Sequence, residues 1–504
     1  MTIRGFKRRF RPLEILTAEQ VEAIHRGTLR VLAETGVAFH DKKALDLLAE
    51  NGCQVDFKEE RVRFPEWLID DCLAKCPSSF RVRAREAQND VILTSGGDMT
   101  YFGSSAGLST VDLDTGEPRP PTRKEFYDYI KVLDFLPHVH MLTAFPYFGF
   151  EKVPQCMRLL ESNAAKIRNS TKVQMEGSVF DNDRWNIEMA KATGQDLLNL
   201  VNPAAPLSYY ETMVSGIYRY VEEAMPFHFA SGPVAGATAP ATIAGAVITN
   251  NVESIAGAVF TQLIRPGTRV WMGNFSTMQD MRTGSPAFGA VGNSLDEVVF
   301  NQMWRRYKVP TWSSSSAWTS SKQIDFQSGY EQAMGAILCA LSGASCVLLQ
   351  GGLTAELTAH PVKAILDDDI AGMVGRFLQG VDVCDETLAV DVIDEVGPIP
   401  GYFLNRAHTR QWWKKEQFVP QVADRLPLAE WVKGDKKKAI DHARERMEEI
   451  LSTHTSKPLP AEQEQGIEDI LKDARQYYRK KGIISDEEWT LYQEDLRSPN
   501  YPYG

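Results

Sequence analysis

The sequence predicts an α/β protein whose centre is a (β/α)₈ TIM barrel, with an N-terminal α+β cap and a C-terminal helical extension. Two observations carry this prediction. Short apolar runs alternate regularly with longer amphipathic stretches, and polar or aromatic residues follow most of the apolar runs. Successive parallel strands need a crossover, usually a helix, so this alternation indicates a parallel sheet. An open doubly wound sheet is the competing architecture, but no GxGxxG loop supports it.

Residues 1–121 have a mixed pattern that predicts the cap. Thr17 and Gln20 form the signature of a capping box at the start of a helix. Another helix, short strands and a third helix are expected to follow. The region also contains an aromatic pair, Tyr101 and Phe102, which opens into a loop of small residues.

The regular alternation occupies residues 122–430 and predicts the barrel. Its eighth strand is not assigned by the pattern, and residues 390–403 are expected either to supply it or to cap the barrel. Residues 431–504 are charged and helical, which predicts an extension that packs on the barrel or on another subunit. The seven expected strands are His140–Ala144, Lys172–Glu176, Leu207–Glu211, Pro226–Ala230, Arg269–Gly273, Pro310–Ser314 and Cys346–Gln350.

Composition excludes several classes of function. The net charge of −11 argues against nucleic-acid binding, and no apolar run is long enough for a membrane span. The N-terminus lacks the apolar core of a secretory signal. The seven cysteines are odd in number and scattered, which is typical of reduced thiols in the cytoplasm. Cys72 and Cys76 lack a nearby histidine, so we expect no metal in this chain.

The carboxyl ends of the expected strands carry the candidate site residues, because catalytic groups of such barrels lie there. Glu176 and Glu211 end two strands, and His228 lies within a third. The loop after the last strand carries Glu356 and His360, of which His360 is the preferred substrate contact. The aromatic residues at or near these ends are Tyr147, Phe227, Trp271 and Trp312. Each ring could instead pack the barrel, and His228 could be a core residue.

Aromatic rings and carboxylates at one mouth suit a permanent cation. A quaternary ammonium group has no proton to donate, so ring faces hold it through cation–π attraction. One buried carboxylate, Glu176 or Glu211, would balance its charge.

The chain resembles the trimethylamine methyltransferase family, in particular the members that lack pyrrolysine and act on quaternary amines. The similarity extends over about residues 16–443 and depends on a set of segments rather than on one motif. These are LTAEQVEAIHRGTLRVLAETGV (16–37), TYFGSSAGLSTVDLDTG (100–116), SGPVAGATAP (231–240), FQSGYEQAMGAILCALSGASCVLLQGG (326–352), LDDDIAGMVGRFLQGVDVCDETLAVDVIDEVGP (366–398) and FLNRAHTRQWW (403–413).

The resemblance implies a (β/α)₈ barrel that moves a methyl group from a quaternary amine to the Co(I) state of a corrinoid (cobalamin). A separate corrinoid-binding protein carries that cofactor. Glycine betaine is the expected donor, giving dimethylglycine. Where relatives that use trimethylamine carry pyrrolysine, this chain has ordinary residues, Leu353–Glu356. A quaternary amine leaves as a neutral tertiary amine, so no general acid is required.

The resemblance also implies roles for the candidate residues. Tyr101, Phe102, Tyr147, Phe227, Trp271 and Trp312 would face the methyl groups. His360 and backbone N–H groups at Gly351 and Gly352 would bind a substrate carboxylate. We expect a cytoplasmic homo-oligomer. The alternatives are methyl transfer from another methylated amine, such as proline betaine, carnitine or trimethylamine, a non-catalytic barrel that binds quaternary amines, and metal-assisted hydrolysis.

Overall fold

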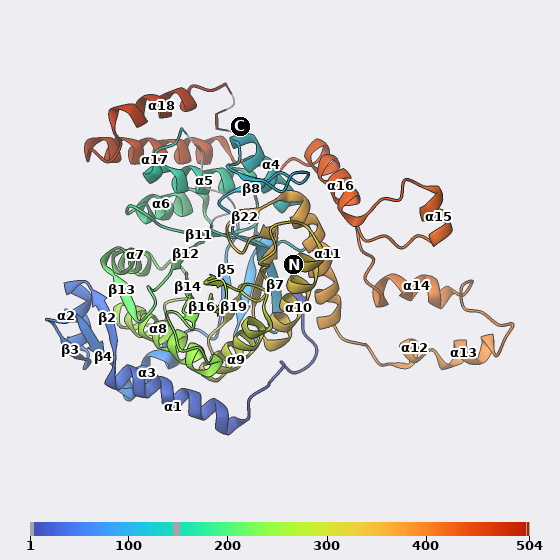
Figure 1. Cartoon of the computed structure of the whole chain (residues 1–504), viewed down its shortest axis with the longest axis horizontal. Helices are drawn as coiled ribbons and strands as arrows, with labels where there is room; N and C mark the ends of the chain where they lie inside the picture. Colours follow the sequence, from blue (N-terminus) through green and yellow to red (C-terminus); the bar gives the residue numbers. More distant parts are fainter. Residues whose placement is uncertain (1–4, 145–151, 500, 503–504) are drawn as a thin grey trace.

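Eight parallel strands close into a barrel at the centre of the chain (Figure 1). The computed structural model describes residues 5–144, 152–499 and 501–502. The last strand pairs with the first, with Cys346 opposite Tyr101, and this pairing closes the ring. The predicted (β/α)₈ fold is therefore confirmed. In order around the barrel the strands are β7 (Met99–Ser104), β10 (Met141–Leu142), β11 (Val173–Glu176), β12 (Leu197–Val201), β14 (Phe227–Ser231), β16 (Val270–Asn274), β19 (Thr311–Ser313) and β20 (Cys346–Gln350).

One strand assignment from the sequence is wrong, and the first of the two options for residues 390–403 is excluded. The third barrel strand is β12, whereas the expected Leu207–Glu211 forms β13 (Ser208–Tyr210), which pairs with β2 (Val37–His40) in a small sheet outside the barrel. Both segments are short and apolar, and only their pairing partners distinguish them. Residues 390–403 supply no strand; they include helix α13 (Val390–Val396).

The eighth strand is β7, which lies inside the region expected to form the cap. It closes the barrel between β10 and β20. The division of the chain at residues 121 and 430 remains a prediction, but the barrel begins before residue 121.

Helices cover the outside of the barrel (Figure 1). The capping box of Thr17 and Gln20 is present at the start of α1. The barrel helices are α4 (Arg123–Phe135), α5 (Gln155–Asn169), α6 (Asp183–Thr193), α7 (Glu211–Glu222), α8 (Ile243–Ile264), α9 (Val291–Tyr307), α10 (Phe326–Ser342) and α11 (Pro361–Leu378).

The N-terminal region covers one side of the barrel and its amino end. Helices α1 (Ala18–Glu34) and α3 (Glu66–Lys75) pack on α8. The hairpin of β5 (Ser79–Val82) and β6 (Val91–Thr94) packs against the interior residue Tyr101. Because Ser345, just before β20, donates a hydrogen bond to Thr94 O at 2.7 Å, this hairpin lies at the amino end of the strands. It closes that end and leaves the carboxyl end for a site.

Helix α8 is, among the described residues, the one helix long and apolar enough to cross a membrane. Most of its apolar window is buried inside the protein, against α1, α3 and α9. It is therefore a core helix of this fold.

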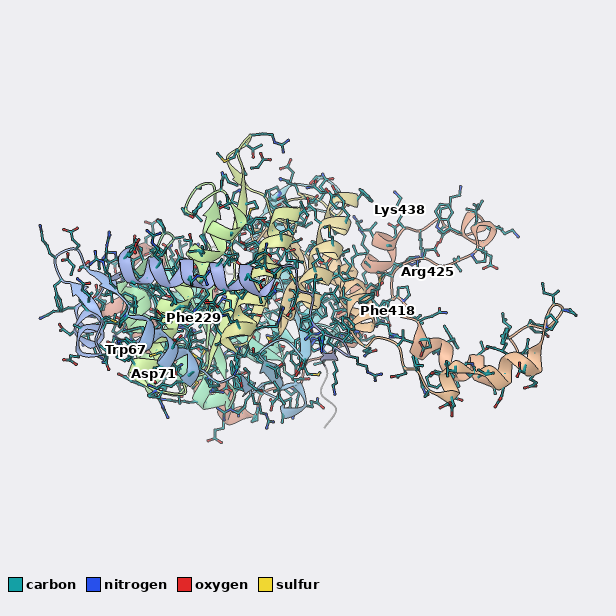
Figure 2. The ribbon with its side chains drawn as sticks, turned by 90° about the horizontal axis from the view of Figure 1, so that it is seen from below. Trp67, Asp71, Phe229, Phe418, Arg425 and Lys438 are labelled. Atoms are coloured by element: carbon teal, nitrogen blue, oxygen red, sulfur yellow. The ribbon has the colours of Figure 1, made fainter. Side chains whose placement is uncertain are left out.

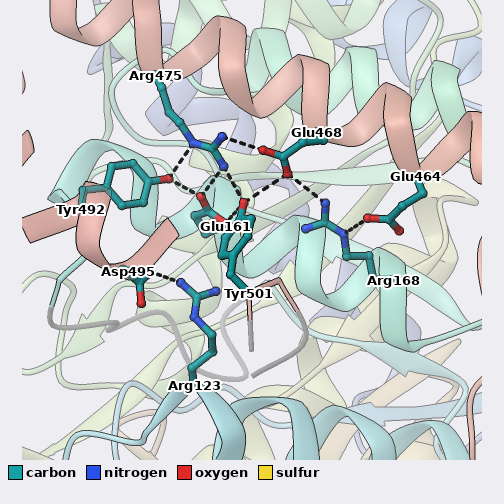
Figure 3. Close-up of polar contacts among 9 residues, drawn as sticks. All are labelled: Arg123, Glu161, Arg168, Glu464, Glu468, Arg475, Tyr492, Asp495 and Tyr501. Atoms are coloured by element: carbon teal, nitrogen blue, oxygen red, sulfur yellow. Dashed lines mark hydrogen bonds and ion pairs between the residues drawn. The ribbon is translucent and has the colours of Figure 1, made fainter. Parts of the chain in front are cut away.

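The C-terminal helices hold the outer side of the barrel through a buried polar network (Figure 3). Helix α17 (Ala461–Lys480) packs on α5 and α6, and α18 (Asp486–Leu496) follows it. Arg475 Nη2 lies 3.0 Å from the buried Glu161 carboxylate of α5, and the Tyr492 hydroxyl donates to the same carboxylate. The extension thus supplies a cation and a hydrogen-bond donor to this buried carboxylate.

A long arm projects from the barrel between α11 and α16 (Ala439–Thr453) (Figures 1 and 2). We define the arm as residues 381–437. Its four helices are α12 (Asp385–Leu388), α13 (Val390–Val396), α14 (Ala407–Glu416) and α15 (Leu428–Lys433). Three of these helices have no buried residue, and α13 has Val396 alone.

Candidate active site: an aromatic cavity with a buried carboxyl group

A cavity of about 340 Å³ lies in the carboxyl half of the barrel. Its size is at the lower end of the range of small-molecule sites. Most of its wall is apolar, and several lining residues come directly after strands, which places the cavity at the carboxyl end. The described lining is Ala106, Leu108, Thr143, Ala144, Leu159, Met175, Val179, Leu200, Asn202, His228, Ala230, Phe275, Trp312, Trp318, Leu348 and Glu356.

Trp312 and His228 form one aromatic group in this cavity. Their ring centroids are 5.7 Å apart, and Trp271 lies 6.0 Å from Trp312 on the neighbouring strand. The Trp312 indole crosses β16 at Gly273, where a Cβ atom would lie 1.9 Å from the ring. Glycine is therefore required at residue 273 for the indole to lie where it does.

A second aromatic group lies in the loops above the strands. Phe275, which follows β16, meets Trp318 edge to face with centroids 5.5 Å apart. The ring centroid of Phe288 lies 5.9 Å from that of Trp318, so the two rings pack against each other. The cavity is thus lined by indole and phenyl rings from two levels of the barrel.

Glu356 brings an ionisable carboxyl group to the same cavity. Its atom Oε2 is buried and has no hydrogen-bond partner among the described residues. Burial raises the pKa of this carboxyl group, because the charged form loses its water. A buried carboxylate oxygen without a partner is costly, and a cationic ligand in the cavity would remove that cost.

The backbone of the loop holds Glu356 in place. Thr354 and Ala355 both have left-handed backbone angles, with φ of 51° and 63°. Their N–H groups donate to Ser321 O and Thr319 O, each at 2.7 Å. Two non-glycine residues in this conformation store strain, which is typical of functional loops.

Of the residues predicted from the sequence, the structure brings four into the barrel interior. His228 and Trp312 line the cavity, and Trp271 packs beside them. Tyr101 lies nearer the amino end, where its hydroxyl accepts a hydrogen bond from Ile92 N at 3.1 Å. Burial lowers the pKa of His228 to about 3, so this ring is neutral at physiological pH.

Phe102 and Phe227 lie on the outer face of the barrel wall. Phe102 packs with Val347, Leu349 and residues of the outer helices, and Phe227 contacts Tyr220 of α7. Neighbouring residues of a strand point to opposite faces, so one member of each adjacent pair must face outward. Tyr147 lies outside the described residues.

The two predicted carboxylates are also outside the barrel interior. Glu176 points outward to α5, where its carboxylate forms a fully buried ion pair with Lys166 at 3.1 Å. Burial raises the pKa of Glu176 to about 7. Glu211 is exposed at the start of α7, because the strand expected before it belongs to the small sheet. Neither of them lines the cavity.

His360 and the two glycines support the loop instead of lining the cavity. His360 is the N-cap of α11, and its Nδ1 accepts a hydrogen bond from Val362 N at 3.1 Å. Burial lowers its pKa to about 4. Gly351 N donates to Asp367 Oδ2 at 2.9 Å, so this N–H group is not free for a substrate carboxylate. Gly352 pairs with Ala359 in a short hairpin.

The sequence therefore does not single out Glu356, the carboxyl group that lines the cavity. The sequence places Glu356 in the loop after the last strand but favours His360 as the substrate contact. The signal for Glu356 is its position, four residues after the Gly-Gly pair that ends the strand. Trp318 and Phe275 carried the weaker signal of aromatic residues after strands. No group of residues suited to a metal ion occurs in the part of the chain that the structure describes.

The fold and cavity define a TIM-barrel protein with an aromatic cavity that contains one ionisable carboxyl group, Glu356. A sequence model of the trimethylamine methyltransferase (MTTB) family matches residues 1–477. The chain belongs to this family.

Several relatives align with almost the whole chain. It is 32% identical to the glycine betaine methyltransferase of Desulfitobacterium hafniense strain Y51, over 89% of this chain and 94% of that protein. It is 28% identical to the trimethylamine methyltransferase MttB of D. hafniense strain DCB-2, over 91% and 94%. The monomethylamine methyltransferase of Methanosarcina barkeri superposes with a TM-score of 0.50 at 13% identity, over 87% of this chain and 89% of that one, which supports the fold alone.

Proposed function

We propose that this protein transfers a methyl group from a quaternary amine to the Co(I) corrinoid of a separate corrinoid protein. Glycine betaine is the proposed donor and dimethylglycine the product. The observation that carries this proposal is the Glu356 carboxyl group, whose buried Oε2 has no partner among the described residues, in a cavity walled by Trp312, Trp318 and Phe275. The similarity to a glycine betaine methyltransferase supports the same substrate class.

The geometry suits a trimethylammonium group better than a protonated amine. Each ring face contributes about 0.5–2 kcal/mol of cation–π attraction, and the Glu356 carboxylate supplies the opposite charge. An N–H donor would need hydrogen-bond acceptors, and besides Glu356 the described lining offers three side chains that can accept, Thr143, Asn202 and His228, in an otherwise apolar wall. Binding of the cation also removes the penalty of a buried, unpaired carboxylate.

A betaine has a carboxylate at its other end, and the cavity holds donors for it. The indole Nε1 atoms of Trp312 and Trp318 have no partner among the described residues. Thr143 and Asn202 are further polar residues of the lining. We assign the carboxylate to this set of donors, in place of His360 and the Gly351 N–H group.

The proposed step needs no proton transfer from the enzyme. The C–N bond breaks and its electron pair stays on nitrogen, which leaves as a neutral tertiary amine. The electron pair of Co(I) forms the new C–Co bond, so cobalt becomes methyl-Co(III). The barrel contributes orientation of the N–CH₃ bond toward the mouth and exclusion of water. This agrees with a loop at residues 353–356 that holds ordinary amino acids.

Methyl transfer to a reduced corrinoid tests the proposal directly. The protein is mixed with Co(I) cobalamin, free or on a cognate corrinoid protein, and with a panel of quaternary and tertiary amines. We expect Co(I) absorbance to fall and methyl-Co(III) to form with glycine betaine and not with trimethylamine. No methyl-Co(III) with any quaternary amine, on either form of the corrinoid, would refute the proposal. Binding of betaine without methyl transfer would identify the non-catalytic alternative.

A further inference from the structure

Three segments that follow barrel strands carry the upper aromatic rings and the carboxyl group of the cavity. The segment between β16 and α9 carries Phe275 and Phe288, and the segment between β19 and α10 carries Trp318. The segment between β20 and α11 carries Glu356. Side chains on loops are held less firmly than those on strands, so the contacts among these segments decide the shape of the cavity.

The segment of Trp318 is bonded directly to the loop of Glu356. Ala355 N donates a hydrogen bond to Thr319 O at 2.7 Å. Thr354 N donates to Ser321 O, also at 2.7 Å. The two donors are the left-handed residues that precede Glu356. The backbone of residues 319–321 therefore sets the direction in which the Glu356 side chain leaves its loop.

Glu331 of helix α10 holds this backbone in place. The residue is 8% exposed and is the one charged residue of α10. Its Oε2 atom accepts hydrogen bonds from Thr319 Oγ1 at 2.5 Å and from Ser320 N at 3.1 Å. Its Oε1 atom accepts from Gln327 Nε2 at 2.9 Å. A buried carboxyl group is costly unless it is hydrogen-bonded, and these three donors offset that cost.

The segment between β16 and α9 meets the same side chain. Gly289 has a φ of 74°, and a Cβ atom at this residue would lie 2.7 Å from Glu331 Cβ and 2.8 Å from Trp318 O. Ser320 Oγ donates to Phe288 O at 3.0 Å. The segments that carry Phe288, Trp318 and Glu356 are therefore joined at or beside Glu331.

The described lining of the cavity does not include Glu331. Its effect on a ligand must therefore pass through Thr319 and Ser320, to Trp318 on one side and to Glu356 on the other. Packing of α10 on the barrel does not itself require a carboxyl group. The buried residues in the following turns of this helix include the small residues Gly335, Ala336, Cys339 and Ala340.

We propose that Glu331 is a positioning residue, which holds the Trp318 ring and the Glu356 carboxyl group so that both contact one bound quaternary ammonium group. The cation then meets a ring face and its counter-charge without rearrangement of the loops, which raises affinity. The identity of the ligand rests on the proposed function. The placement of the two loops by Glu331 does not.

Two substitutions of similar shape test this role. Glu331→Met removes both acceptor oxygens, whereas Glu331→Gln keeps one oxygen for Thr319 Oγ1 and Ser320 N. We expect glycine betaine to bind about tenfold or more weakly to the Met variant and within about threefold of the wild type to the Gln variant, by calorimetry. Thr319→Val removes one donor from the other side and should weaken binding about threefold, and it replaces the Met variant if that chain does not fold.

A double-mutant cycle tests whether Glu331 acts through Glu356. In a chain that already carries Glu356→Gln, adding Glu331→Met should weaken betaine binding by a smaller factor than it does in the wild type, because the counter-charge that it positions is gone. Equal factors in the two backgrounds would overturn the proposal.

Glu253→Met is the matched control for the loss of a buried glutamate. Glu253 also accepts hydrogen bonds from a hydroxyl and a backbone N–H group, those of Ser231 and Leu207, but it bonds to none of the three segments. This variant should unfold at a lower urea concentration and bind betaine as the wild type does. An equal loss of affinity in Glu253→Met and Glu331→Met would show a general weakening of the fold, and would overturn the proposal.

A measurement without ligand separates this proposal from the proposed function. The chain is labelled with 5-fluorotryptophan, and the fluorine resonance of Trp318 is assigned with Trp318→Phe. We expect this resonance to shift or broaden in Glu331→Met and to stay near its wild-type position in Glu331→Gln. A wild type that neither binds betaine nor forms methyl-Co(III) would refute the proposed function, while the Trp318 resonance would still report the role of Glu331. An unchanged Trp318 resonance in Glu331→Met overturns that role.

Discussion

Gly273 and Trp312 face each other across strands β16 and β19, and the indole lies where a side chain at residue 273 would be. Because Gly273 has no side chain, the Trp312 indole can pack closely against the barrel wall at β16. Together with His228 and Trp271 it builds the aromatic floor of the cavity. The size of one residue therefore shapes the wall of the cavity.

Gly273→Ala tests this relationship. The added methyl group cannot fit without displacing Trp312, and overpacking of this kind costs about 1–3 kcal/mol. We expect a lower free energy of unfolding in urea and weaker binding of glycine betaine by calorimetry. Gly466→Ala, within helix α17, is the matched control. A Cβ atom at residue 466 would lie 3.7 Å from the Cβ atom of Ala192, which is an ordinary contact distance. Unchanged betaine affinity in Gly273→Ala would contradict the assigned role of Trp312.

Glu356→Gln removes the carboxylate while keeping the shape of the side chain. We expect glycine betaine to bind about tenfold or more weakly, because the cation loses its counter-charge in a site of low polarity. The free protein should not lose stability, since the variant no longer buries an ionisable group. Calorimetric titration and thermal unfolding measure the two effects.

The affinity of the wild type should also depend on pH. Burial raises the pKa of Glu356, so its carboxylate becomes protonated as the pH falls, at a higher pH than an ordinary glutamate. Betaine affinity should fall with the pH in this range, whereas Glu356→Gln should show no such dependence. An identical pH profile in both proteins would remove Glu356 from the site.

The Lys166–Glu176 ion pair has a structural role that can be separated from catalysis. Lys166→Met leaves Glu176 buried without its partner and should lower the free energy of unfolding by about 3–5 kcal/mol. Adding Glu176→Gln should recover much of this loss, because no buried charge then remains. Urea unfolding of the single and double variants measures the effect. A stable double variant that binds betaine but transfers no methyl group would return Glu176 to the candidate site residues.

Several buried carboxyl groups should make the protein less stable as the pH rises. Burial raises the pKa values of Glu253 and Asp296 to about 7. Between an ordinary pKa of about 4 and this value, the folded chain holds protons that the unfolded chain has released. Their contribution to stability is therefore present at low pH and is lost as the pH rises through about 7.

Glu253→Gln isolates one of these groups. Glu253 accepts hydrogen bonds from Ser231 and from Leu207 N, and glutamine preserves its shape. We expect the difference in unfolding free energy between pH 5 and pH 8 to be smaller in the variant than in the wild type. An equal difference in both proteins would show that Glu253 ionises normally.

Substitutions of His360 distinguish two roles for this residue, a contact with the substrate and the N-cap of helix α11. Asparagine is also a good N-cap, so His360→Asn should retain stability and methyl transfer, while His360→Ala should lose about 0.5–2 kcal/mol of stability. Chemical unfolding and methyl transfer by both variants provide the measurement. A loss of turnover in His360→Asn with the fold intact would support the role first expected for His360.

The sequence by itself determined the barrel and most of its elements. Local signals were sufficient there, because a buried strand such as Cys346–Gln350 is apolar and brief, and a helix such as Asp183–Thr193 has its own periodicity. The same signals predicted a group of aromatic residues at the carboxyl end of the strands; that this group binds a cation stays a prediction.

Only the tertiary structure decided which residues meet. Leu197–Val201 and Leu207–Glu211 look alike in sequence, and pairing with β11 or with β2 separates them. Glu176 and Glu356 are both acidic residues at or after strand ends, yet one faces Lys166 and the other the cavity. The direction of a side chain depends on the register of the strand and the path of the loop, which are set by contacts between residues far apart in the sequence.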